Sequence, residues 1–136
     1  MRWLLLSILI AFLATGCTDE RKSDDALITE VARTYVEAMY NGDPADAYEL
    51  LDSRSQALCG KRRIIELGAM YHAMRETFLT ITFDRVEDIE IDGDKATAKV
   101  FRKVNGSTRY YESRADHFVK EKGKWRYAEP AQYERC

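Results

Sequence analysis

Cysteine and histidine, which most often act as nucleophiles, zinc ligands or bases near neutral pH, are few in this chain. It contains three cysteines, Cys17, Cys59 and Cys136, and two histidines, His72 and His117. The histidines stand far apart, no cysteine pair has the spacing of a zinc site, and no serine lies in a nucleophile elbow. We therefore expect neither a metal nor another cofactor. The chemistry that remains is that of the cysteines and of His117.

The residues before Cys17 have the layout of a secretory signal. Arg2 gives a positive start, an apolar run extends from Trp3 to Leu13 with only Ser7 interrupting it, and small residues follow at positions 14 to 16. As a helix this run would be about 16 Å long, whereas crossing the hydrocarbon core of a bilayer takes about 20 residues. We expect residues 1–16 to be a signal peptide and not a permanent transmembrane helix.

The segment Leu13-Ala14-Thr15-Gly16-Cys17 resembles the lipobox of bacterial lipoproteins, although Leu13 stands one place earlier than usual and Ala14 fills its position. In such proteins the cysteine receives a diacylglyceryl thioether and becomes the new N-terminus. The resemblance implies that Cys17 is lipidated. The alternative is an ordinary signal peptide followed by a chance cysteine.

A lipidated Cys17 would be a durable membrane anchor, because each buried methylene contributes about 0.8 kcal/mol and two or three chains act together. Residues 17–25 would then be the lipidated cysteine and a short polar tether, too polar to form packed structure. The eight residues after Cys17 reach at most about 28 Å. Thr18, in place of aspartate, favours the outer membrane over the inner one in enteric-type sorting. We expect a location in the cell envelope.

Composition predicts one domain, residues 26–136, that does not bind nucleic acid. Without residues 1–16 the chain carries 20 basic and 23 acidic side chains, with the two signs interspersed. No basic patch of the kind that binds nucleic acid follows from this distribution.

Cys59 and Cys136 remain as a pair, and an oxidising envelope would permit them to form a disulfide. Closing so long a loop could stabilise the fold by about 4 kcal/mol and would hold a C-terminus that otherwise frays. Two free thiols in a reducing envelope are the alternative.

The first half of the domain has helical periodicity. From Asp24, apolar residues recur at three- and four-residue intervals up to Asn41-Gly42, and Asp43 and Pro44 then begin a short helix that ends at Leu51. Asp52 to Ser55 is expected to be a break. A third helix follows Lys61-Arg62-Arg63, and its predicted inner face comprises Ile64, Leu67, Tyr71, Met74 and Phe78. Its basic start suggests an anionic partner such as lipid headgroups, or simply a solvated helix end.

After about Thr77 the apolar residues alternate with a period of two, which is typical of strands. Asp92-Gly93-Asp94, Asn105-Gly106 and Lys122-Gly123 are hairpin signals between these strands. Helices followed by hairpin-linked strands predict an α+β fold in which N-terminal helices pack on a curved antiparallel sheet.

The chain resembles the nuclear transport factor 2-like superfamily, whose members form a cone with a pocket. The matching features are the first helix, the Asn41-Gly42-Asp43 link into a helix ending at Leu50-Leu51, and the closing hairpin from Val119 to Tyr127 with Gly123-Lys124-Trp125. Within that superfamily it looks most like small bacterial lipoproteins of unassigned function.

In such a cone the strand residues Tyr111, Ser113, Ala115, His117 and Val119 are expected to point inward, with Tyr35 and Trp125. The candidate pocket is therefore lined by Tyr35, Tyr111, Ser113, His117 and Trp125, and would suit a small, partly apolar ligand. His117 is the residue expected to titrate near neutral pH there. A hydrogen-bonded core histidine is the more ordinary interpretation.

Three functions follow from this interpretation. The favoured one is a non-enzymatic envelope lipoprotein, membrane-bound through Cys17, that binds a small ligand or an envelope protein. The second is a lipid-anchored isomerase or dehydratase that uses His117 in the cone, although no residue pattern carries over that chemistry. The third is a structural or assembly module of the envelope.

Overall fold

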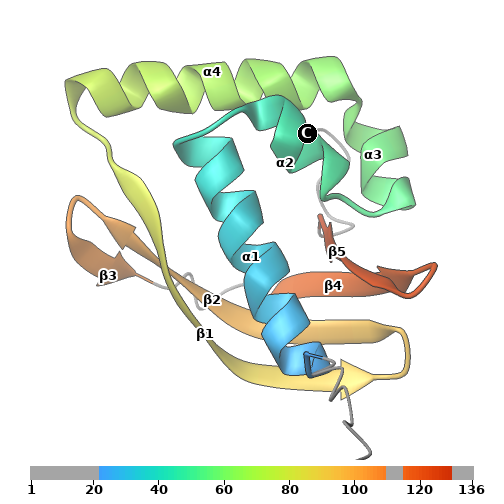
Figure 1. Ribbon diagram of the computed structural model, residues 1–136. Helices are drawn as coiled ribbons and strands as arrows, with labels where there is room; N and C mark the ends of the chain where they lie inside the picture. Colours follow the sequence, from blue (N-terminus) through green and yellow to red (C-terminus); the bar gives the residue numbers. More distant parts are fainter. Residues whose placement is uncertain (1–21, 110–114, 130–136) are drawn as a thin grey trace, which may run out of the picture.

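The protein is described by a computed structural model over residues 22–109 and 115–129 (Figure 1). In these ranges four helices precede a five-stranded antiparallel sheet, which confirms the expected α+β class. The elements are α1 (Asp24–Tyr40), α2 (Pro44–Glu49), α3 (Ser53–Cys59), α4 (Lys61–Thr77), β1 (Ile81–Asp92), β2 (Lys95–Val104), β3 (Ser107–Arg109), β4 (Asp116–Glu121) and β5 (Lys124–Ala128). The signal segment and Cys17 lie outside the described residues.

Helix α1 lies across the inner face of the curved sheet and supplies much of the core (Figure 1). Its start is set by Ser23, whose hydroxyl accepts a hydrogen bond from the Ala26 amide at 3.2 Å. Asp24 and Asp25 in the first turn suit the positive end of the helix dipole. The buried side includes Ile28, Ala32, Tyr35, Val36 and Met39, as the periodicity predicts.

Two short helices follow, of which only the first was predicted. Asp43 caps α2 with Pro44 at its first position, as expected. The second helix does end before Asp52, but the predicted break through Ser55 is too long: Asp52 is the N-cap of α3 and accepts a hydrogen bond from the Ser55 amide at 3.1 Å. Aspartate and serine serve both turns and N-caps, so their presence alone does not distinguish a break from a new helix.

Helix α4 packs on α2 at the end of the domain opposite the start of α1 (Figure 1). On its predicted inner face Ile64 is buried and Leu67, Tyr71 and Met74 are half-buried. Phe78 departs from the prediction, because it follows the last helical residue and is 68% exposed. Helix α4 approaches α2 closely at Gly68, where the absent side chain makes room for the Pro44 ring.

The sheet has the order β1-β2-β4-β5, with β3 paired to the other end of β2. All three predicted hairpin turns are confirmed, and Gly93, Gly106 and Gly123 have the positive φ angles that such turns require. The side of β2 that faces α1 carries the buried residues Ala96, Ala98, Val100 and Val104, in the alternation expected from the sequence.

Hydrogen bonds join the helices to both edges of the sheet, and the first set lies at the end of α1. Near its C-terminus Glu37 accepts a hydrogen bond from the Phe83 amide at 3.0 Å, and the Asn41 side chain donates one to the Ile81 carbonyl at 2.7 Å. On the opposite edge the Tyr127 amide donates to the Leu50 carbonyl at 2.9 Å. Across residues 22–109 and 115–129, no helix is both long and apolar enough to cross a membrane.

Replacing Gly68 by alanine tests the close approach of α4 to α2. A Cβ at this position would lie 2.0 Å from Cγ and 2.4 Å from Cβ of Pro44, and a proline ring cannot rotate away. Although alanine favours helix by about 1 kcal/mol over glycine, we expect Gly68→Ala to lower the free energy of unfolding by about 1–3 kcal/mol. Urea denaturation checks this. Ala69→Ser on the exposed side of the same turn is the matched control, and a Gly68→Ala protein as stable as this control would contradict the packing described.

Candidate functional site

A buried polar cluster of Arg102, Asp116 and Tyr127 lies on the inner face of the sheet. One Arg102 side-chain nitrogen, Nη2, donates to Asp116 Oδ1 at 2.8 Å, and the Tyr127 hydroxyl donates to the same carboxylate oxygen. The other terminal nitrogen, Nη1, donates to the Val100 carbonyl at 3.0 Å. The side chains of Arg102 and Asp116 are only 12% and 9% exposed. The cluster is therefore a compensated ion pair in the interior.

Asp116 lies where the pairing of β2 and β4 ends. Strand β4 pairs with β2 from Lys95↔Val119 to Ala98↔Asp116. Beyond it the Val100 amide donates to Asp116 Oδ2 at 3.3 Å instead. The carboxylate thus satisfies a backbone amide and a guanidinium at the same time, which is how a buried charge is tolerated.

An aromatic stack connects this cluster to helix α1. The rings of Tyr35 and Tyr127 are parallel with centroids 4.0 Å apart, and Phe118 meets Tyr127 edge-on at 5.4 Å. The Tyr35 hydroxyl donates to Glu129 Oε1 at 2.8 Å. One hydrophobic contact surface thus joins α1, β4 and β5.

The ionisation of the cluster is fixed by its surroundings. Burial raises the pKa of Tyr127 well above its ordinary value, and the nearby Asp116 carboxylate adds to the effect. Burial likewise raises the pKa of Tyr35, together with Glu129. Burial disfavours the charge on Arg102, but Tyr127 and Asp116 outweigh it and raise the pKa of the guanidinium. Both tyrosines remain protonated donors and the arginine remains charged at neutral pH.

One polar atom of the cluster is left without a hydrogen bond. Arg102 Nε is shielded from solvent and has no acceptor within the described part of the chain. The second such atom is Nε2 of His72, a half-buried residue of α4.

Trp125 is buried, as predicted, and binds the start of α1. Its indole nitrogen donates to Asp24 Oδ1 at 2.9 Å, and Lys120 Nζ lies 3.0 Å from the same oxygen. These two hydrogen bonds, from Trp125 first and then Lys120, lower the pKa of Asp24. The β4–β5 hairpin thereby holds the N-terminal end of α1.

The predicted orientation of His117 is wrong. His117 is exposed, whereas its neighbours Asp116 and Phe118 are buried. Cross-strand partners share a face, and the register pairs Phe118 with Tyr127 and Lys120 with Trp125, so the inward side of β4 holds the even-numbered residues. Side chains alternate between the two faces of a strand. If the inward residues are assigned one position out of phase, every side chain of the strand is placed on the wrong face. The hypothesis of an enzyme that uses His117 inside the cone therefore lacks its base.

The remaining predicted site residues divide between those described and those outside the described ranges. Tyr35 and Trp125 are buried, as expected. Tyr111 and Ser113 lie outside the described residues, as do Cys17 and Cys136. Cys59 is buried at the end of α3, and its pairing with Cys136 stays a prediction.

Sequence reasoning missed Arg102, Asp116 and Tyr127 as a group. A signal for one of them was present, because Arg102 continues the alternation of Ala96, Ala98 and Val100 and so falls on the buried face. A lone charge in an apolar alternation indicates a buried ion pair. Its partner is supplied by another strand, so the sequence did not reveal it.

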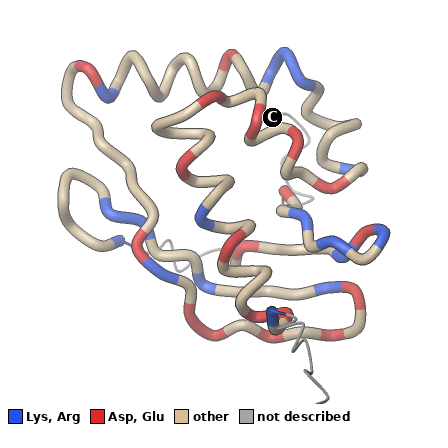
Figure 2. Tube along the Cα trace, in the orientation of Figure 1, with Lys and Arg blue, Asp and Glu red and all other residues tan. Residues whose placement is uncertain are grey.

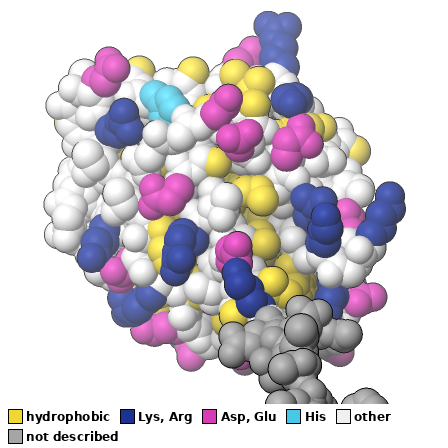
Figure 3. Space-filling model, viewed as in Figure 1, with side chains coloured by type: hydrophobic (Ala, Val, Ile, Leu, Met, Phe, Trp, Pro, Cys, Tyr) yellow, Lys and Arg dark blue, Asp and Glu magenta, His cyan; other side chains and the backbone are white. Residues whose placement is uncertain are grey.

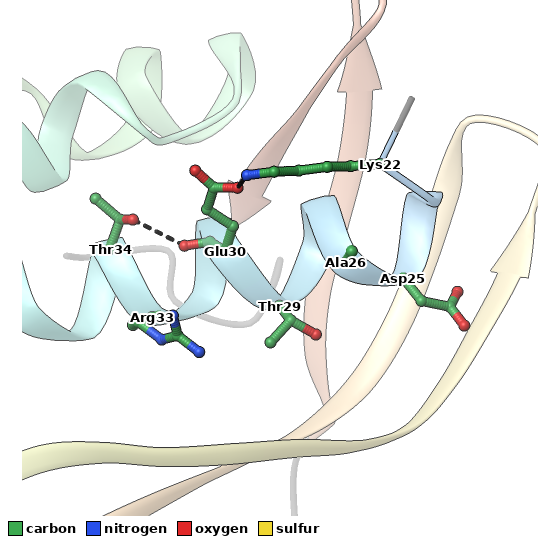
Figure 4. Close-up of a pocket in the computed structure, with 7 residues that line it drawn as sticks. All are labelled: Lys22, Asp25, Ala26, Thr29, Glu30, Arg33 and Thr34. Atoms are coloured by element: carbon green, nitrogen blue, oxygen red, sulfur yellow. Dashed lines mark hydrogen bonds and ion pairs between the residues drawn. The ribbon is translucent and has the colours of Figure 1, made fainter. Parts of the chain in front are cut away.

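A second candidate is a shallow, open depression on the surface of α1 (Figure 4). Its residues all come from α1 and the residue just before its cap: Lys22, Asp25, Ala26, Thr29, Glu30, Arg33 and Thr34. Figure 4 shows that Lys22 reaches Glu30 along the helix while Asp25, Thr29 and Arg33 point away from that pair. These side chains do not converge on a common point. Among the described residues no cluster of three or more acidic, histidine or cysteine side chains could hold a metal.

Comparison with solved structures agrees with the sheet-and-helix arrangement. The chain is similar to a protein from Campylobacter jejuni provisionally described as an NTF2-like transpeptidase, with 18% identity over 74% of this chain and 96% of the other and a TM-score of 0.56. The chain has the nuclear transport factor 2-like fold. A domain of unknown function with a cystatin-like fold from Nostoc punctiforme is 15% identical over 79% of this chain and 75% of the other, with a TM-score of 0.48. No protein-family model matches the sequence, and no curated protein matches it.

Removing one member of the buried ion pair tests its importance. Asp116→Ala leaves the Arg102 guanidinium buried without a counter-charge, so we expect the free energy of unfolding to fall by about 3–5 kcal/mol. The double variant Arg102→Met/Asp116→Leu removes both charges and is expected to recover a large part of that loss. Chemical denaturation of both proteins measures the difference. Glu30→Gln, which breaks an exposed ion pair with Lys22, is the control and should change stability little. A single variant as stable as this control would contradict the role described.

Proposed function

We propose that this protein is a membrane-anchored envelope lipoprotein whose nuclear transport factor 2-like domain binds a partner and does not catalyse a reaction. The observation that carries the non-catalytic part is that, among the described residues, the one acidic side chain of the buried cluster, Asp116, is already used in contacts with its neighbours. Asp116 is occupied by Arg102, Tyr127 and the Val100 amide. A general base must be within hydrogen-bond reach of the substrate proton that it removes. A carboxylate whose oxygens are already bonded to neighbouring groups is poorly placed for this.

The anchoring part of the proposal is supported by the lipobox-like segment and by the start of the fold. Helix α1 begins at Asp24 and its capping residue is Ser23. Only five residue steps separate Cys17 from Lys22, the first described residue, which is at most about 18 Å of extended chain. A lipid on Cys17 would hold this end of the domain close to the bilayer.

The fold also supports the predicted disulfide. The Glu129 amide donates to the Ser55 hydroxyl at 2.9 Å. Glu129 therefore lies next to α3, and seven residues, 130–136, follow it in the sequence. Cys59 lies one turn beyond Ser55 and is buried. Seven residues span at most about 25 Å, which is ample for Cys136 to reach Cys59.

Mass spectrometry of the protein purified from membranes of its source organism tests the anchor. We expect the N-terminal peptide to begin at Cys17 and to carry the mass of a diacylglyceryl group, with or without a further acyl chain. Cys17→Ser is the matched control and should leave the membrane fraction. A mature N-terminus with an unmodified Cys17, or one produced by cleavage elsewhere, would refute the lipoprotein proposal.

Peptide mapping without reduction tests the disulfide. We expect the peptides containing Cys59 and Cys136 to be linked, and Cys136→Ser to lower the melting temperature, because the cross-link restricts the unfolded chain. The same map after reduction is the control. Alkylation of both cysteines in the unreduced protein would show that the pairing is wrong.

A further inference from the structure

Two arginines are neighbours on the inner face of the sheet. The register of β2 and β3 pairs Arg102 directly with Arg109. Such cross-strand partners share a face with their Cβ atoms about 5 Å apart, and like charges placed in this way lower the stability of a sheet. Figure 2 shows basic residues of β2 and β3 close together where these strands pair. Pairs that oppose the stability of a fold occur mostly at functional sites.

The fold balances only one of these two charges. The buried guanidinium of Arg102 donates to the Asp116 carboxylate at 2.8 Å, as described above. Arg109 is exposed, and no hydrogen bond or ion pair joins it to another residue of the described ranges. Arg102 is itself not saturated, because its Nε has no acceptor there. The Arg109 guanidinium therefore lies beside a buried positive charge and has no counter-charge of its own in the described part of the chain.

The surface around this strand pair has no broad basic patch. Figure 3 shows basic and acidic side chains intermixed on the surface around β1. Several of the basic ones are already in ion pairs, such as Lys103 with Asp84 at 3.3 Å and Lys99 with Asp88 at 2.7 Å. An anion that binds on the inner face would therefore meet one free guanidinium.

Partly buried aromatic rings lie near Arg102 on the inner face. Phe83 of β1 is the register partner of Arg102 on its other side, so Phe83, Arg102 and Arg109 form one row across three strands. Tyr40, at the end of α1, interacts electrostatically with the Arg102 guanidinium, and its ring meets that of Tyr71 edge-on at 4.7 Å. Phe83, Tyr40 and Tyr71 pack against the core but are only partly buried. Apolar surface is thus available beside the charged pair.

We infer that Arg109, with the row beside it, binds a small organic monoanion, namely a carboxylate on an apolar or aromatic body. This inference rests on the proposed binding function and names a ligand class for it. A guanidinium holds a carboxylate through two parallel N–H···O bonds. One free guanidinium matches the single charge of a carboxylate, whereas a phosphate dianion would leave one negative charge without a partner. The body of the ligand would contact the rings of Phe83 and Tyr40.

Binding of benzoate, with benzamide as its neutral counterpart, tests this site. The melting temperature of the full-length protein in detergent would be measured against benzoate concentration at constant ionic strength, which yields a dissociation constant. We expect benzoate to raise the melting temperature and benzamide to leave it unchanged. Arg109→Gln should weaken benzoate binding at least about tenfold, because it removes the charged donor pair. Without benzoate this variant should be at least as stable as the wild type, because the repulsion between the arginines is relieved.

Lys103→Gln is the matched control for Arg109→Gln. Lys103 is an exposed base of the same strand pair, but it follows Arg102 directly and so lies on the outer face. Its replacement should leave benzoate binding unchanged.

Four results would overturn the inference: no effect of benzoate, an equal effect of benzamide, an equal effect of inorganic phosphate, or benzoate binding that Arg109→Gln leaves unchanged. The mass of the Cys17 peptide separates this site from the proposed anchor. A lipidated Cys17 without benzoate binding would leave the anchor in place and remove the anion site. Benzoate binding that depends on Arg109, in a protein with an unmodified Cys17, would do the reverse.

Discussion

The buried ion pair between Arg102 and Asp116 is the constraint on which the arrangement of the inner face depends. A guanidinium in the interior is costly unless a counter-charge and hydrogen bonds accompany it, and here Asp116, Tyr127 and the Val100 carbonyl provide them. Satisfying this one group fixes the relative positions of β2, β4 and β5. Tyr127 in turn stacks on Tyr35, which sets the helix above the sheet. The buried ion pair is therefore linked to helix α1 through contacts among four side chains, those of Arg102, Asp116, Tyr127 and Tyr35.

The same arrangement bears on function. The carboxylate on the inner face, Asp116, is already occupied by its own neighbours. Both tyrosines of the stack are kept protonated by burial, and the arginine is kept charged. Groups with such pKa values are suited to holding a structure together and ill suited to exchanging protons near neutral pH. Among the described residues, these groups therefore hold the elements of the inner face together, while other residues form the surfaces of the domain.

Those surfaces are unequal. Three basic residues, Lys61, Arg62 and Arg63, lie together at the start of α4, acidic residues lie along β1, and α1 begins at the end of the domain opposite α4 (Figures 1 and 2). Hydrogen bonds from Trp125 and Lys120 to Asp24 hold the first turn of α1 against the β4–β5 hairpin. If Cys17 is lipidated, as proposed, the membrane attachment would be close to this hairpin-bound end of α1.

The sequence by itself determined the elements whose signals are local. The amphipathic period of α1, the Asp43-Pro44 start of α2 and the three glycine-containing turns depend on neighbouring residues only, and each lies where it was predicted. Helix α3 was missed because Asp52 suits a turn as well as a cap. Tyr35 and Trp125 each continue an apolar pattern within a helix or strand and are buried, whereas Phe78, which follows the end of α4, is exposed.

The tertiary structure alone decided the face of β4. Nothing local distinguishes Asp116 inside from His117 inside, since the alternation is the same and only its phase differs. The phase is set by the register with β5, which places Phe118 opposite Tyr127, and by the guanidinium of Arg102, which requires a carboxylate from another strand. The buried cluster thus depends on strand pairing and on an ion pair between residues far apart in the sequence. It could therefore be recognised only from the tertiary structure.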